Sequence, residues 1–305
     1  MSIPLRLFHG DYGRVALLQM DAPLVSHAHQ HCHLLLKAAG PDTAFLVRGK
    51  LCPLTNDNAV LINAWEEHAY LHELKGEATN TVLLALYLEP SWLAKFSQFF
   101  ANSHHPHFFK NSSTRLSDAQ KQSIEKVVME LWWSNSISSE RLENLLLDLT
   151  LSFVDPRDAI HPHFIQSSHL NTSFMDPRIR RAMQMMKSSI DAAHNLAEVA
   201  QTVNLSRSHF FELFRRCSGL SPLVYANVIK MDFALNALAS PDVSLIDIGE
   251  ELGFSAQSHF TRFFKQHQGV VPSLYRRQIE TTEIITTKKI RRFGKSTDCL
   301  VNHRS

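Results

Sequence analysis

Six histidines near the start of the chain carry the side chains best suited to chemistry. Four of them occupy every second position of one stretch and two follow later: His27, His29, His31 and His33, then His68 and His72. Alternate residues of an extended strand share one face, so the first four are expected to line up on one side. Neutral imidazoles suit iron, zinc, nickel or copper. They also donate and accept hydrogen bonds, which suits an organic effector, and a solvated run without function is a third interpretation.

A second group of polar side chains shares one face of a predicted helix, residues 256–267. The buried stripe of this helix is aromatic: Phe260, Phe263, Phe264 and His267. The opposite face is polar and cationic: Gln257, Ser258, Thr261, Arg262 and Lys265. Such a face fits the base edges and phosphates of a DNA major groove. We expect Lys265 to lie near a phosphate and the other four residues to contact bases.

A helix-turn-helix must position this face. Ser244 and Asp247 form a capping box, which predicts a helix from residue 245 to 252. Gly253 permits a left-handed turn, and Ser255 is expected to cap the second helix. The second helix of such a motif lies in the major groove.

The same unit occurs about 50 residues earlier, over residues 196–225. Asn195 with Glu198 forms its cap, and Asn204 takes the place of Gly253 at the turn. Helix 222–239 joins the two copies, so two recognition helices are expected in major-groove segments about 34 Å apart. The corresponding reading face consists of Arg207, Ser208, Phe211, Glu212 and Arg215.

Two residues of this first face have alternative interpretations. Glu212 is suited to accept a hydrogen bond from a cytosine amino group, or to discourage wrong contacts. Phe211 is suited to contact a thymine methyl, or simply covers the helix. Arg215 and its neighbour Arg216 also fit an ordinary solvated face.

Residues 176–277 resemble the DNA-binding domain of the AraC/XylS family of bacterial transcription regulators. The second motif, GFSAQSHFTRFFKQHQGVVPSLYR, carries this resemblance most strongly. It implies a sequence-specific transcriptional regulator, an effector-responsive activator rather than an enzyme. Promoter double-stranded DNA and RNA polymerase are the implied partners. The alternative is an all-helical core domain whose repeat is only architectural.

Residues 1–89 have the pattern of an all-β domain. Closely spaced turn signals separate short apolar stretches, which predicts a sandwich or barrel. The stretches are 16–20, 34–38, 45–47, 59–62 and 81–88. The histidine pattern resembles the cupin sensor domain common in AraC-type regulators, with His27, His29, His33 and His68 in its characteristic places.

The cupin resemblance implies an effector pocket at His27, His29, His33 and His68. Trp65 and Tyr70 are expected as its apolar walls, or as plain core. No cofactor is expected. The alternative is a transition metal on the four histidines, in a metal sensor or a metal-dependent cupin enzyme fused to a DNA-binding domain. A constitutive DNA binder with a vestigial barrel is a third hypothesis.

The expected fold class is α+β, a cupin-like β-barrel with a helical extension, followed by an all-α domain of two helix-turn-helix motifs. The expected domains are a sensing barrel at 1–89, a helical dimerisation or packing region at 90–154, a linker at 155–175, the DNA-binding domain at 176–280 and a basic tail at 281–305. We expect a homodimer, with packing against the chain's own barrel as the alternative for the apolar helix stripes.

Charge and composition agree with this division. Residues 1–175 have 13 Lys or Arg against 17 Asp or Glu, residues 176–280 have 12 against 10, and residues 281–305 have 6 against 2. Basicity thus rises toward the end expected to meet phosphate. The four cysteines have no CxxC spacing, and the longest apolar run is too short for a membrane span. A cytoplasmic protein without membrane attachment is expected.

Overall fold

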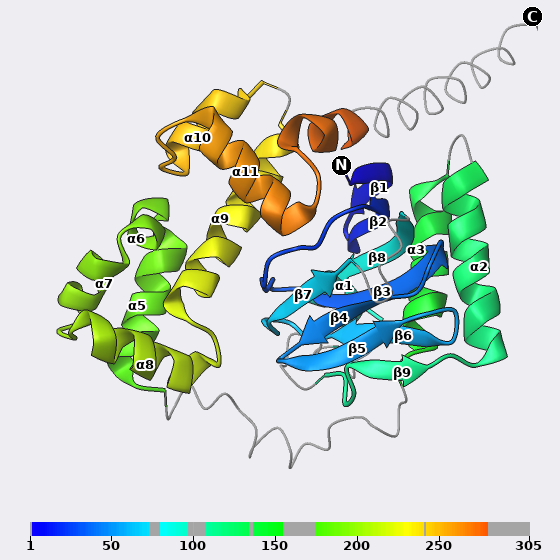
Figure 1. The fold of residues 1–305 in the computed structure, drawn as a ribbon, viewed down its shortest axis with the longest axis horizontal. Helices are drawn as coiled ribbons and strands as arrows, with labels where there is room; N and C mark the ends of the chain where they lie inside the picture. The colour runs from blue at the N-terminus through cyan, green and yellow to red at the C-terminus, as the bar shows by residue number, and fades with distance from the viewer. Residues whose placement is uncertain are drawn as a thin grey trace, which may run out of the picture.

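The computed structural model describes residues 2–72, 80–96, 100, 108–133, 137–154, 175–240 and 242–279 (Figure 1). An N-terminal part of strands and helices is followed by a part built of helices alone. The α+β organisation expected from the sequence is therefore confirmed. The predicted linker and basic tail lie almost entirely outside the described residues, at 155–174 and 280–305.

Two antiparallel sheets form the N-terminal part. The strands are β1 (Ile3–Gly10), β2 (Gly13–Met20), β3 (Cys32–Ala39), β4 (Thr43–Val47), β5 (Lys50–Leu54), β6 (Asn58–Ile62), β7 (His68–Leu71), β8 (Thr81–Leu88) and β9 (Ser113–Arg115). One sheet has the order β1-β2-β8-β3-β6-β9 and the other β5-β4-β7. The described strands thus pair as two separate sheets, where a closed barrel was expected.

Alternate side chains of the central strands belong to two different apolar cores. Leu34 and Leu36 of β3 pack on one side with the helices, whereas Leu35 between them packs against the smaller sheet. The same alternation separates Leu84 from Leu83 in β8. Because successive side chains of a strand point to opposite faces, β3 and β8 are covered on both faces, and their side chains are mostly apolar.

Helices α1 (Pro90–Ala94), α2 (Asp118–Trp133) and α3 (Ser139–Leu151) follow the strands. The apolar stripes of α2 and α3, which include Ile124 and Val127 of α2 and Leu142 and Leu146 of α3, are buried against the six-stranded sheet. This chain's own sheet therefore covers them. Strand β9 lies between α1 and α2 along the chain.

The C-terminal part is all-helical. Its helices are α5 (Pro177–Ser188), α6 (Ile190–His194), α7 (Leu196–Thr202), α8 (Arg207–Ser218), α9 (Pro222–Leu238), α10 (Leu245–Glu251) and α11 (Gln257–Gln268), with helical residues 272–279 at the end. Helices α7 and α8 form the first predicted motif and α10 and α11 the second. Helix α9, 17 residues and therefore about 26 Å long, joins them (Figure 1).

Local signals explain most of these helix ends. The capping box of Ser244 and Asp247 is present, and the Asn195 side chain accepts from the backbone N–H of Glu198. The residues at the two turns have positive φ, 55° at Asn204 and 72° at Gly253. Within the described residues, no helix combines the length and apolar character needed to cross a membrane.

The predicted cap of α11 is wrong. Ala256 is the N-cap residue, without a side-chain cap hydrogen bond. The Ser255 hydroxyl instead contacts Nδ1 of His259 at 3.0 Å. The hydroxyl of Ser255 therefore pairs with a side chain one turn along the helix rather than with a backbone amide.

Candidate nucleic-acid interface and effector site

The polar face predicted on α11 lies on the outside of the helix. Gln257, Ser258 and Arg262 are exposed, and Thr261 and Lys265 are half-buried. Phe260 and Phe264 on the opposite face are completely buried among side chains of α9 and α10. The aromatic stripe thus anchors the helix and leaves hydrogen-bonding groups free to approach a base pair.

The corresponding face of α8 is exposed as well. Arg207, Ser208, Glu212 and Arg215 are exposed, while Phe211 is half-buried against the first helical core. The guanidinium of Arg207 lies 5.7 Å from the centroid of the Phe211 ring, a cation–π distance. This packing favours the interpretation in which Phe211 covers the helix.

A close contact fixes the second motif against α6, the helix before the first motif. A Cβ atom at Gly253 would lie 2.6 Å from the ring of His194 in α6. Nδ1 of the same His194 lies 2.9 Å from Nζ of Lys230 in α9. The turn between α10 and α11 therefore packs directly on α6, which precedes the first motif, and a side chain at position 253 would collide with His194.

Four of the predicted effector residues form one cluster in the N-terminal part. His27 and His68 exchange backbone hydrogen bonds of 2.9 and 2.8 Å, and their ring centroids are 4.3 Å apart. The ring of His29 lies 4.9 Å from that of His68, and its Nε2 lies 3.2 Å from Nδ1 of His33. His33 stacks on Tyr87 at 3.9 Å.

Burial keeps these imidazoles neutral. Desolvation lowers the pKa of His27, His29 and His33 well below the ordinary value and that of His68 to about 4. Positive charge on one ring also disfavours positive charge on its neighbours. Neutral rings with one protonated and one unprotonated nitrogen are the form that binds a metal or exchanges hydrogen bonds.

The other predicted residues lie outside the cluster. His31 lies beside it, with its Nε2 3.0 Å from Oε2 of Glu89. His72 follows the end of β7. Tyr70 is fully buried in the core between the sheets. Trp65 stacks on Tyr225 of α9 with centroids 5.2 Å apart.

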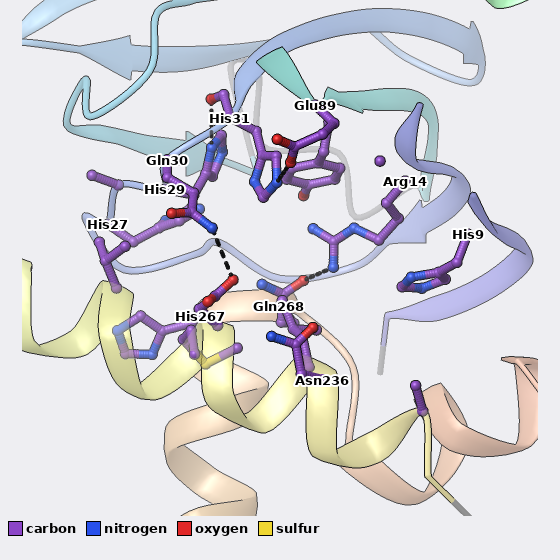
Figure 2. A pocket seen from close by; sticks show the side chains of 18 of the residues that line it. His9, Arg14, His27, His29, Gln30, His31, Glu89, Asn236, His267 and Gln268 are labelled. Atoms are coloured by element: carbon purple, nitrogen blue, oxygen red, sulfur yellow. Dashed lines mark hydrogen bonds and ion pairs between the residues drawn. The ribbon is translucent and has the colours of Figure 1, made fainter. Parts of the chain in front are cut away.

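A cavity of about 400 Å³ lies between the N-terminal strands and helices α9 and α11 (Figure 2). His27, His29 and His31 line it, whereas His33, His68 and the predicted walls Trp65 and Tyr70 do not. Several polar residues that the sequence did not single out also line it: His9, Arg14, Gln30, Glu89, Asp232, Asn236 and Gln268. They come from distant segments, so no spacing in the sequence could have revealed them.

Arg14 is the most unusual of these residues. It is only 8% exposed, and its guanidinium lies 3.6 Å from the centroid of the Tyr87 ring. It donates hydrogen bonds of 3.0 Å to Oε1 of Gln268 and to the hydroxyl of Tyr275. Among the residues that the structure describes, no carboxylate forms an ion pair with it. A buried cation without an acid is costly unless a ligand supplies the negative charge.

Two exposed recognition helices on paired helix-turn-helix motifs define a DNA-binding protein of the helix-turn-helix class. Residues 199–278 match the family described as a helix-turn-helix domain. The C-terminal part thus contains a helix-turn-helix domain, and the expected resemblance to AraC/XylS regulators is confirmed.

Curated relatives are transcription regulators. The chain is 29% identical to the arabinose operon regulatory protein of Escherichia coli K12 over 61% of this chain and 59% of that protein. It is 28% identical to the regulatory protein PocR of Salmonella typhimurium over 50% of this chain and 52% of that one. The first relatives are thus matched over about half of their length. The probable transcriptional regulator LumQ of Photobacterium leiognathi is 24% identical over 84% of this chain and 93% of that protein.

The whole fold has a solved counterpart. The apo form of a ToxT variant from Vibrio cholerae aligns with a TM-score of 0.54 and 14% identity, covering 90% of this chain and all of that one. This likeness concerns the fold, since the sequences have diverged widely. It extends the similarity beyond the helix-turn-helix domain to the N-terminal sheets.

Proposed function

We propose that this chain is a transcription regulator that binds promoter DNA through α8 and α11. The observation that carries this proposal is the exposure of Gln257, Ser258 and Arg262 on a helix held by buried Phe260 and Phe264. In this reading Gln257, Ser258, Thr261 and Arg262 contact bases and Lys265 a phosphate. On α8 the contacts come from Arg207, Ser208, Phe211, Glu212 and Arg215.

The regulator responds to a small-molecule effector in the cavity between the two parts of the chain. This position supports regulation, because a ligand there touches strands of the sensor and helices of the DNA-binding domain together. The guanidinium of Arg14 forms no ion pair among the described residues and is suited to bind the carboxylate of an organic anion. Of the predicted set, His27 and His29 line this cavity, and His33 and His68 pack against them. The proposed sensor is a divergent, open cupin-like fold.

The remaining features of the proposal follow from the relatives. The chain activates transcription with RNA polymerase as its partner, acts in the cytoplasm, and does no catalysis. It acts as a homodimer. The exposed outer side of α2 supports pairing of two chains, since Trp132 and Trp133 lie there with Met129.

Selection of bound duplexes from a random DNA pool tests the regulator function. The purified full-length chain is expected to enrich a bipartite sequence whose halves lie about one helical turn apart. A variant with Gln257 and Arg262 both replaced by Ala should lose enrichment of one half only. Failure of the wild-type chain to enrich any sequence over random DNA contradicts the proposal.

A further inference from the structure

The ring nitrogens of the histidine cluster form a regular set of hydrogen bonds, which an effector-binding wall does not require. In three of its rings Nδ1 lies 2.8–2.9 Å from a backbone carbonyl oxygen two residues away: His27 to Val25, His29 to His31 and His68 to Glu66. A carbonyl oxygen only accepts, so each Nδ1 carries the proton of the neutral ring. Each Nε2 is therefore left with its lone pair.

These three rings converge. One ring nitrogen of each lies within 4.8 Å of those of the other two. Because the backbone engages the Nδ1 atoms, Nε2 is the nitrogen available to a ligand. Nε2 of His68 is buried and has no hydrogen-bond partner among the described residues. Buried polar atoms are rarely left without a partner, so this lone pair is suited to bind a ligand.

Backbone anchoring of the second nitrogen is the usual arrangement around a metal-bound histidine. It fixes the tautomer and holds the ring in the orientation that binds the ion. Hydrogen bonds within the cluster explain only one of these Nε2 atoms. Nε2 of His29 lies 3.2 Å from Nδ1 of His33, which can donate to it, whereas no described residue donates to Nε2 of His68.

We propose that His27, His29 and His68 bind a divalent transition-metal ion, Zn²⁺ foremost, through their Nε2 atoms. Imidazole nitrogens suit Zn²⁺ and its neighbours in the series but not Mg²⁺ or Ca²⁺. Zn–N bonds of about 2.1 Å place tetrahedral ligand nitrogens roughly 3.4 Å apart, so the rings close inward by about 1 Å on binding. Three protein ligands leave a fourth position open.

The open position faces the cavity between the two parts of the chain, because His27 and His29 line it. Arg14 lies in the same cavity, so an anion there balances both positive charges. The site also borders the second recognition helix. The ring centroid of His27 is 6.3 Å from that of His267 in α11, and the amide of Val25 donates to the carbonyl of Gln266.

Metal titration of the full-length chain tests the site. The protein is stripped with a chelator and titrated with Zn²⁺ against a chromophoric competitor. We expect one tightly bound ion per chain and a loss of about 100-fold or more in affinity in His68→Ala. His31→Ala is the matched control, since His31 lies in the same stretch but contacts Glu89. Each variant removes one of the 18 histidines, so nonspecific binding is equal in both.

Two further measurements keep the result clear if His68→Ala folds poorly. Co²⁺ added to the unmodified chain should give the intense visible absorption of a four-coordinate site, and His29→Gln should abolish it. Weak six-coordinate absorption, or wild-type affinity in both ligand variants, overturns the site. DNA binding is measured separately: a chain that holds one Zn²⁺ but selects no DNA contradicts the regulator function and supports the metal site.

Discussion

Arg14 of β2 donates a hydrogen bond of 3.0 Å to Gln268, the last residue of α11 (Figure 2). The first residue of the same helix is Gln257, on the predicted reading face. Since a helix of 12 residues is about 18 Å long and stiff, a displacement at its sensor end moves its DNA end. The contact therefore links the cavity to the reading face through one rigid element.

Arg262→Ala is expected to relax sequence preference at one base pair. A guanidinium that reads a guanine is worth about 1–3 kcal/mol of discrimination, and its loss should appear at a single position. Binding to a set of duplexes with each position substituted in turn measures this effect. Arg216→Ala is the control, because this exposed arginine of α8 lies outside the predicted reading face and should weaken all duplexes alike. An unchanged preference in Arg262→Ala removes the assignment of Arg262 to a base.

Arg14→Gln is expected to abolish stabilisation by organic anions. A carboxylate that binds only the folded chain raises the free energy of unfolding by about 2.7 kcal/mol at 100 times its dissociation constant. Thermal unfolding across a panel of aliphatic and aromatic monocarboxylates measures this rise. Arg115→Gln removes an equal charge from an exposed site on β9 and should respond like the wild type. Equal responses in Arg14→Gln and the wild type would contradict an anion at Arg14.

Trp65→Ala should weaken docking of the sensor on the DNA-binding domain. Trp65 stacks on Tyr225 with an interplanar angle of 20°, and Nζ of Lys187 lies 5.7 Å from the Trp65 ring centroid. An aromatic pair contributes about 0.5–1.5 kcal/mol beyond its buried area. Fluorescence energy transfer between labels on the two parts should fall in this variant. Leu51→Ala, at a site on β5 that is 53% exposed, should leave the transfer unchanged.

Gly253→Ala should destabilise the chain more than Gly219→Ala. Both glycines have positive φ, 72° and 77°, which costs an L-residue about 1–2 kcal/mol. The added methyl group at Gly253 also collides with His194 at 2.6 Å, whereas the structure describes no atom within 4 Å of a Cβ at Gly219. Urea unfolding of both variants separates the collision from the backbone strain. Equal losses of stability would show that the His194 ring moves aside freely.

Local chemistry made much of the DNA-binding domain predictable. The cap of Asn195, the capping box of Ser244 and the left-handed turn at Gly253 each depend on a few neighbouring residues, and all three are present. Helical periodicity likewise separated the buried Phe260 and Phe264 from their exposed neighbours. The wrong prediction that Ser255 caps α11 also concerns neighbouring residues, because the Ser255 hydroxyl contacts the His259 ring in place of a backbone amide.

The sensor was predictable only in part. The structure does bring His27, His29 and His33 together, but only His33 lies in a strand, and the alternate spacing did not indicate that His31 contacts Glu89. Trp65 was expected in a pocket, yet it lies against Tyr225 of another part of the chain. Nothing in the sequence of residues 1–89 indicates that α9 packs against this part of the chain.

By itself, the sequence determined the helix-turn-helix repeat, the polar faces of its second helices and a histidine-rich sheet region. These properties follow from hydrogen bonds and side-chain periodicity over a few residues. Only the tertiary structure decided where the sensor meets α11, and with it the cavity at Arg14 and the convergence of His27, His29 and His68. These arrangements depend on segments up to about 260 positions apart, as Arg14 and Tyr275 are, whose contact arises only when the N-terminal strands pack against the C-terminal helices.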